Sequence, residues 1–270
     1  MKNFNKSFLL IIGISVSLFQ SSCSDDDNTS GGGGDDSAIM ITQQEMTTTT
    51  QGSYTLAAYS YAENDLDPGD SGENVVWDFS GQENPQSTIL STTGACPGNQ
   101  NCGQFTDANR IQWLEVLDTS PTYTYFSFTN NEYSVIGDYS VENGKNTYND
   151  QEILYKFPIV YGQAFDDNYQ TSFGTSPDGT TNGEVSIEVD GYGTIITPAG
   201  TFNNVLRIKR LRTVTNPNIP GFVVNSEEYE WLDNNGIGRC IVQNAATTFN
   251  GNTVKASVLL YTITYTSSGN

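Results

Sequence analysis

Two pairs of carboxylates have the residue type and spacing that could support acid–base chemistry. Glu228 and Glu230 are two positions apart in an alternating stretch, and Glu188 and Asp190 repeat that spacing. On an extended strand, such side chains share one face and lie roughly 6.6 Å apart, near the separation used by inverting glycosidases. Any solvent-facing strand has the same spacing, so an ordinary polar strand face is the alternative. The pattern allows a carboxylate-based glycan hydrolase without requiring one.

The 270-residue chain contains no histidine. This excludes Ser-His-Asp triads, Cys-His dyads, histidine-ligated zinc sites and imidazole general bases. Gly69-Asp70-Ser71-Gly72 matches the nucleophile tetrapeptide of trypsin-like proteases, but the histidine that would activate the serine is missing. We therefore interpret this tetrapeptide as a loop.

An acidic loop is the main candidate metal site, and Asp166-Asp167-Asn168 is a weaker candidate for the same role. The loop places four carboxylates in residues 64–73, namely Asp65, Asp67, Asp70 and Glu73. Ca²⁺ takes about six to eight oxygen ligands, and such a loop could supply several of them. The spacing departs from the EF-hand pattern, and a solvated acidic loop is the alternative. Calcium is thus the only cofactor that the sequence suggests.

Basic residues are concentrated in one segment of a strongly acidic chain. Arg207, Lys209, Arg210 and Arg212 fall within six positions, whereas the formal net charge is −20. They could balance the acidic stretch Glu227–Glu230, or they could bind an acidic glycan or another anionic partner. The overall charge argues against nucleic acid, whose phosphates need neutralising cations, and against electrostatic docking on anionic lipid.

The cysteines have three different expected roles. Cys96 and Cys102 are six positions apart, and in an exported chain they should form a small disulfide loop. Cys240 shares strand parity with Val242, which favours a buried thiol. Cys23 belongs to the N-terminal export signal.

Residues 1–22 have the organisation of a lipoprotein signal peptide. Lys2 and Lys6 form a basic start, and the apolar segment 8–19 is too short to span a bilayer. Ser21-Ser22-Cys23 ends the segment like a lipobox, with Gln20 where leucine is usual. We expect Cys23 to be acylated and residues 23–37, rich in Asp and Gly, to form a disordered tether.

Beyond the tether, residues 38–270 predict a single all-β domain. Apolar and polar residues alternate in several stretches, including 133–142, 185–190 and 228–231, and turn signals separate them. The stretch 109–117 fits either a helix or a strand. The apolar face of the last stretch, 253–266, changes side near its middle, which requires a bulge or burial on both faces. We expect an antiparallel, strongly curved sheet that forms a sandwich or a half-closed barrel.

A hairpin centred on residues 197–200 organises this domain. Thr197-Pro198-Ala199-Gly200 fits a tight turn in which Gly200 takes a positive φ. The run Asp190-Gly191-Tyr192-Gly193-Thr194, followed by Thr197–Phe202 and Val205-Leu206-Arg207, resembles a motif of uncharacterised secreted β-proteins from Bacteroidota. Trp77-Asp78-Phe79-Ser80 and the segment from Phe157 to Phe165 match further features of those proteins. The resemblance covers about residues 74–232, implies a fold and an extracytoplasmic setting, and supplies no catalytic residue.

These features together predict a surface-exposed lipoprotein. Ser24-Asp25-Asp26-Asp27 resembles the acidic signal that directs Bacteroidota lipoproteins to the outer face of the outer membrane. We expect a membrane contact through the lipid, no nucleic acid, and a glycan or an envelope protein as partner. A non-catalytic binding or structural role is favoured over an enzyme. The histidine-free glycan hydrolase is the alternative.

Overall fold

Strands make up most of the described chain. The computed structural model describes residues 39–49, 52–63, 65–82, 84–96, 102–116, 120–174 and 179–267. The predicted signal peptide, Cys23 and the tether lie outside these residues. The helices within them are short, α1 (Gln43–Thr49) and η2 (Cys102–Gln104). In this described part, no helix has the length and apolar character needed to cross a membrane.

The strands follow one another along the chain with mostly short connections. They are β1 (Met40–Ile41), β2 (Gly52–Ala62), β3 (Gly72–Asp78), β4 (Ser87–Ala95), β5 (Arg110–Val116), β6 (Thr122–Phe128), β7 (Glu132–Ser140), β8 (Gly144–Lys156), β9 (Ile159–Val160), β10 (Ala164–Phe173), β11 (Thr180–Thr197), β12 (Gly200–Thr215), β13 (Val223–Leu232), β14 (Gly238–Phe249) and β15 (Asn252–Ser267). The stretch left open between helix and strand is therefore the strand β5.

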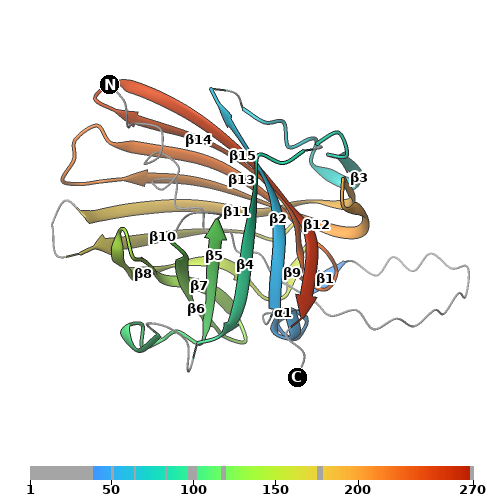
Figure 1. Cartoon of the computed structure of the whole chain (residues 1–270), viewed down its shortest axis with the longest axis horizontal. Helices are drawn as coiled ribbons and strands as arrows, with labels where there is room; N and C mark the ends of the chain where they lie inside the picture. Colours follow the sequence, from blue (N-terminus) through green and yellow to red (C-terminus); the bar gives the residue numbers. More distant parts are fainter. Residues whose placement is uncertain are drawn as a thin grey trace, which may run out of the picture.

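Twelve of these strands form one closed, barrel-like antiparallel sheet. Its order is β10-β8-β7-β6-β5-β4-β2-β15-β14-β13-β12-β11, and β10 closes the ring by pairing with β11, from Ala164↔Glu188 to Ser172↔Thr180. In Figure 1, the long strands β10, β13 and β14 run across the view, whereas β2, β4 and β5 run from top to bottom. The predicted antiparallel all-β fold with strong curvature is confirmed, and the curvature is sufficient to close the sheet.

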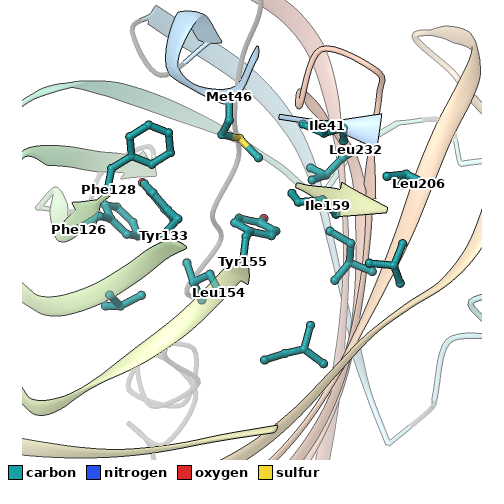
Figure 2. Packing of buried hydrophobic residues seen from close by; sticks show 14 of the residues in the cluster. Ile41, Met46, Phe126, Phe128, Tyr133, Leu154, Tyr155, Ile159, Leu206 and Leu232 are labelled. Atoms are coloured by element: carbon teal, nitrogen blue, oxygen red, sulfur yellow. The ribbon is translucent and has the colours of Figure 1, made fainter. Parts of the chain in front are cut away.

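The inside of the ring holds the main apolar cluster. It contains Tyr133, Val135 and Leu154 from one wall, and Val185, Ile187, Leu206 and Ile208 from the opposite wall. Figure 2 shows Met46 of α1 and Ile159 of β9 projecting into this cluster from above and beside it. The helix and the small β1–β9 sheet therefore pack onto the interior of the ring.

Helix α1 has a recognisable start signal that the strand-based reading missed. Thr42 and Glu45 form a capping box: the Glu45 amide donates to Thr42 Oγ1 at 3.3 Å, and the Thr42 amide donates to Glu45 Oε2 at 2.5 Å. The pattern Thr-x-x-Glu was visible in the sequence, but seven residues are too few to show helical periodicity. Met46 is fully buried, which anchors this short helix by packing.

The outside of the ring carries a second apolar cluster that β3 covers. Strand β3 lies parallel to the second half of β11, from Gly191↔Gly72 to Ile196↔Asp78. It places Trp77, 2% exposed, against Trp231 and Val205. Trp77 and Trp231 are both buried in this cluster, which agrees with the alternating apolar stretches in which they occur.

The central hairpin and the last strand follow their expected geometry. Thr197 pairs with Gly200 at the end of the β11–β12 hairpin, and Gly200 has a φ of +151°. In β15 the register shifts between Thr262 and Thr264. Both faces of β15 are buried before this bulge, which explains why its apolar pattern changes side.

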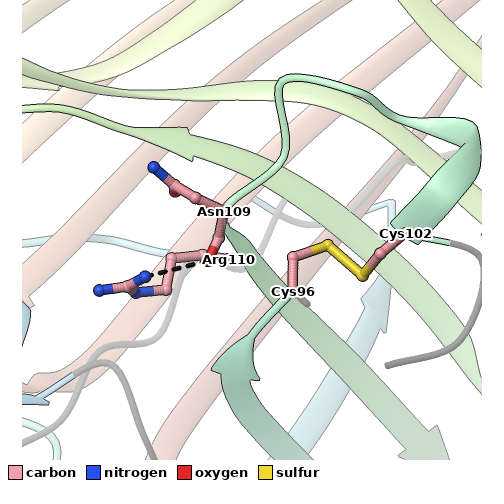
Figure 3. The surroundings of a disulfide bond; sticks show 4 residues. All are labelled: Cys96, Cys102, Asn109 and Arg110. Atoms are coloured by element: carbon pink, nitrogen blue, oxygen red, sulfur yellow. Dashed lines mark hydrogen bonds between the residues drawn. A yellow bond between two sulfur atoms is a disulfide. The ribbon is translucent and has the colours of Figure 1, made fainter. Parts of the chain in front are cut away.

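The predicted small disulfide is present. Cys96 and Cys102 are joined with an S–S distance of 2.11 Å, next to Asn109 and Arg110 (Figure 3). Cys96 is buried in a third cluster with Phe105 and Tyr125 on the outer face of β5–β7. The disulfide therefore ties Cys102, and with it residues 102–109, to Cys96 at this part of the sheet. Cys240 is a free, buried thiol, as its strand parity indicated.

Candidate functional site

A network of buried charges crosses the interior of the ring. Arg210 of β12 is 1% exposed, and its Nη1 donates to Glu228 Oε1 at 2.8 Å and to Glu230 Oε2 at 2.9 Å. The register places Arg210 opposite Glu228, so alternation along β12 and β13 puts these side chains on the same inner face. We call Glu152, Arg210, Arg212, Glu228 and Glu230 the interior charge network.

Arg212 extends the network to the opposite wall. Its Nε donates to Glu152 Oε1 of β8 at 2.6 Å, and its Nη1 donates to Glu228 Oε2 at 3.3 Å. Tyr155, also on β8, donates its hydroxyl to Glu230 Oε2 at 2.5 Å. The strands β8 and β12 are not neighbours in the sheet. These contacts therefore connect the two walls across the enclosed space.

Burial raises the pKa of the acidic groups Glu230 and Tyr155 in and beside this network. Removal from water raises the pKa of Glu230, and the neighbouring Arg210 guanidinium and the Tyr155 hydroxyl oppose that rise. The carboxylates raise the pKa of Arg210 and Arg212 despite their burial, so both stay cationic. Burial also raises the pKa of Tyr155, which therefore remains a neutral hydroxyl donor.

Several polar atoms of the network have no partner among the described residues. They are Arg210 Nε, Arg210 Nη2, Arg212 Nη2 and Glu230 Oε1. A buried guanidinium can donate five hydrogen bonds, and here several of these are not made. The network is thus held together by ion pairs but is incompletely satisfied.

The pair Glu228 and Glu230, which suggested hydrolysis, lies inside the ring. Both carboxylates are at most 2% exposed and share one arginine nitrogen. A glycosidase needs its two carboxylates on either side of a bound sugar and open to it. Two surface depressions among the described residues lie elsewhere, one around Val254 and the other around Leu211. Within the part of the chain that the structure describes, the two carboxylates are enclosed and held by Arg210.

Arg207 performs a separate task on the outer face of the sheet. Its Nε and Nη2 donate to the two carboxylate oxygens of Asp190 at 2.8 and 3.0 Å, and its Nη1 donates to the carbonyls of Pro68 and Gly69 at 3.0 and 2.8 Å. The guanidinium carbon lies 5.3 Å from the ring centroid of Trp77. Arg207 therefore ties the loop before β3 to the central hairpin.

The contact between β3 and β11 explains the sequence motif that includes Trp77, residues 190–194 and Arg207. Gly193 faces β3 so closely that a Cβ there would lie 2.0 Å from the Val75 carbonyl oxygen. At Gly191, a Cβ would lie 3.0 Å from the Trp77 ring. The motif residues Trp77, Asp190 and Arg207 meet at this contact. The motif thus encodes the docking of β3 and contains no reactive group.

The four basic residues at 207–212 do not form one surface. Arg210 and Arg212 point into the ring, and Arg207 is buried on the outer face with Asp190. Lys209 is the only one with partial exposure, and its ammonium lies 5.9 Å from the Tyr229 ring centroid. The three arginines are paired with carboxylates, as the charge-balance interpretation expected. They therefore do not form an anion-binding patch.

The acidic loop does not converge on a point. Asp65 pairs with Lys255 at 2.7 Å, Asp67 accepts from the Gly69 amide at 2.8 Å, and Glu73 accepts from the Tyr192 hydroxyl at 3.2 Å. The fourth carboxylate, Asp70, is exposed. Across the described residues, no three such side chains gather as metal ligands. The loop is a solvated connection that Arg207 holds at its Pro68 and Gly69 carbonyls.

Two members of the interior arrangement, Glu152 and Tyr155, were missed by the sequence reading. A glutamate on an alternating strand normally faces water, so Glu152 gives no signal by itself. The useful signal was in β12, where Arg210 and Arg212 share parity with Leu206 and Ile208. Arginine on the apolar face of a strand indicates a buried partner carboxylate.

Comparisons with known proteins identify no family. No family model matches the chain, and no curated protein matches it. One similar solved structure is a Bacteroides fragilis protein described as exported, with a YmcC-like fold. It is 11% identical, has a TM-score of 0.43, and the match covers 85% of this chain and 100% of that one. Another, described as a lipoprotein from Parabacteroides distasonis, is 13% identical with a TM-score of 0.34, covering 80% and 96%. At these scores the likeness supports no functional argument.

Proposed function

We propose that this chain is a lipoprotein of the bacterial outer membrane that faces outward and acts as a non-catalytic binding or structural module. The observation that carries the proposal is Ser21-Ser22-Cys23, which follows a basic start and a short apolar segment. One acyl chain holds a protein only marginally, so stable anchoring requires the several chains of a bacterial lipoprotein. Its partner is a glycan or another envelope protein.

The arrangement of charged groups supports a non-catalytic role. The carboxylate pair that suggested hydrolysis, Glu228 and Glu230, is enclosed and bound to Arg210. Arg207 is engaged by Asp190 and by backbone carbonyls. These groups contribute to structure, and none of them faces a depression in which a substrate could react. The module therefore acts through its outer surface.

The anchor is tested by replacing the lipidated residue. Cys23→Ala should move the protein from the membrane fraction to soluble or unprocessed material, because the thiol that receives lipid is gone. Ser24→Ala is the matched control, since it changes the adjacent residue but keeps the thiol, and it should stay in the membrane fraction. A Cys23→Ala protein that remains membrane-bound and exposed would show that the chain is held by another envelope protein.

The outward orientation needs its own experiment. Replacing Asp25-Asp26-Asp27 with Asn-Asn-Asn should leave the protein lipidated and in the membrane fraction. Protease added to whole cells should then cleave the wild-type protein but not this variant. Equal cleavage of both would disprove the role assigned to the acidic signal.

A further inference from the structure

We propose that Glu230 keeps its proton at neutral pH, and that this proton stabilises the folded protein by keeping the interior charge network free of an unbalanced charge. Loss of the proton on alkalinisation would destabilise the folded state. The ring would then contain a pH-sensitive element at its centre, separate from the surface role proposed above.

The first argument is a count of charges. The interior charge network has two guanidinium groups, Arg210 and Arg212, and three carboxyl groups, Glu152, Glu228 and Glu230. If all were ionised, the network itself would carry one uncompensated negative charge. An unpaired buried charge is much less favourable than a neutral group, so one carboxyl should carry a proton.

The second argument identifies which carboxyl is neutral. Glu152 receives Arg212 Nε, and Glu228 receives a nitrogen from each arginine, one on each oxygen. Glu230 shares Arg210 Nη1 with Glu228, and both of its hydrogen bonds end on Oε2. Its Oε1 is buried without a partner among the described residues. A protonated Oε1 with Oε2 as the carbonyl oxygen fits this arrangement, because an unpaired hydroxyl is easier to bury than half of a carboxylate.

Arg110 of β5 is a further cation on the inner face, where its guanidinium carbon lies 5.4 Å from the Phe128 ring centroid and the charge acts on Tyr133. Among the described residues, the groups that act on Glu230 itself include Arg210 as the one cation. They are Tyr155 from β8, Arg210 from β12, Glu228 from its own strand, Tyr133 from β7 and Tyr54 from β2. The tyrosines are buried, and burial raises the pKa of each, so they stay neutral near pH 7. Glu228 is the only other acid in this set, and its charge opposes ionisation of Glu230.

The consequence for the fold follows from where these groups sit. Tyr155 and Glu152 belong to one wall, and Arg210, Arg212 and Glu230 belong to the other. A second negative charge beside Glu228 would set two carboxylates in competition for the single nitrogen that they share. The folded protein should therefore lose stability as the pH rises, although the Tyr155 hydrogen bond partly offsets this loss.

The test compares wild type with Glu230→Gln, whose amide imitates the protonated acid. Urea unfolding followed by tryptophan fluorescence gives both unfolding constants from pH 4.5 to 9. The ratio of the wild-type constant to the variant constant should rise by up to about tenfold per pH unit, since the unfolded chain releases a proton that the folded chain keeps. The rise should begin near the ordinary glutamate pKa of about 4.3 and continue past pH 7. A ratio that is level from pH 6 upward would overturn the proposal.

Two controls separate this effect from a general weakening. Glu228→Gln removes a carboxylate held by both arginines, so it should destabilise the protein at every pH without the same slope. If the pH profile of Glu228→Gln were identical to that of Glu230→Gln, the proton would not belong specifically to Glu230, and the proposed assignment would be wrong. Asp138, a half-buried acid elsewhere on the sheet, is present in both wild type and Glu230→Gln, so its effect on stability cancels in their ratio.

A direct readout covers the case in which Glu230→Gln does not fold. Infrared spectra of Asp138→Asn should show a protonated carboxyl band at pH 7. In Asp138→Asn/Tyr155→Phe, this band should persist to higher pH than in Asp138→Asn, because the lost hydroxyl favoured the ionised form. Absence of the band at pH 7, or a shift to lower pH, would exclude a proton on Glu230.

Discussion

Arginine serves two different purposes within six residues of β12. Arg207 combines a bidentate contact to Asp190 with two backbone carbonyls, which uses the fixed fork of its guanidinium. Arg210 and Arg212 instead neutralise carboxylates inside the ring. Adjacent side chains in a strand point to opposite faces. Arg207, at an odd position, therefore lies on the outer face, whereas Arg210 and Arg212, at even positions, lie inside the ring.

Removing the Arg207 side chain should be severe. Arg207→Ala leaves the Asp190 carboxylate buried without its partner and frees the loop carbonyls, and breaking such a pair typically lowers the free energy of unfolding by about 3–5 kcal/mol. Urea denaturation measures the change. Lys209→Ala, on the same strand and face but partly exposed, is the control and should change stability by no more than about 0.5 kcal/mol. Equal effects of the two substitutions would disprove the role of Arg207.

Asp138 should make stability depend on pH. Burial raises its pKa from 3.8 to about 6 despite a hydrogen bond from Asn146. The unfolded chain ionises first as the pH rises, so wild type should lose up to about 3 kcal/mol relative to Asp138→Asn between about pH 4 and 6. Below that window both states are protonated, and above it the difference is constant. Thermal melts of both proteins across pH 3.5–8 check this, and a constant difference would contradict it.

At the scale of elements, β3 depends on glycine in its neighbour. Strand β11 pairs with β10 along its first half and with β3 along its second half, so one long strand serves two partners. The second contact is close because Gly193 has no side chain, and it has an unusual φ of +159°. The glycines of β11 thus allow β3 to pack closely, and β3 in turn covers the outer apolar cluster that contains Trp77 and Trp231.

A methyl group at position 193 should release β3. In Gly193→Ala, the new Cβ would overlap the Val75 carbonyl oxygen, so β3 must move away from β11 and Trp77 should become exposed. Tryptophan emission should shift to the red, and protease should cut within residues 72–78. Gly81→Ala is the control, because a Cβ there meets nothing within 4 Å. Normal emission in Gly193→Ala would show that β3 is held in another way.

At the scale of the whole molecule, the ring is joined twice. The β10–β11 ladder closes it through backbone hydrogen bonds, and the interior charge network joins its walls through side chains. Ionic contacts in an enclosed space are poor sources of net stability but strongly oppose any arrangement that separates the partners. We therefore expect the network to specify how β8 packs against β12.

A double-mutant cycle at Glu152 and Arg212 measures this connection. Glu152→Ala leaves Arg212 with only its longer contact to Glu228, and it should lower the free energy of unfolding by about 3–5 kcal/mol. Adding Arg212→Leu removes the unpaired charge, so the double variant should be more stable than the sum of the single changes predicts. Simple additivity would mean that the two walls are not coupled here.

Most strands and several local features could be predicted from the residues and their spacing, although helix α1 was not. Alternation and turn residues indicated strands, the parity of Cys240 indicated a buried thiol, and the spacing of Cys96 and Cys102 indicated their disulfide. The turn at Gly200 and the change of face in the last strand were also readable, because they depend on neighbours in the chain. The expectations for residues 1–37 rest on the sequence alone.

Which face of each strand is enclosed depends on the closure of the sheet. Alternation shows that a strand has two different faces, but it cannot show whether a polar face meets water or the inside of a closed sheet. Glu228, Glu230 and Arg210 therefore looked like surface residues, although pairing between strands distant in sequence encloses them. Closure depends on the β10–β11 ladder and on the sum of twists around twelve strands, and neither is encoded in any short stretch of sequence.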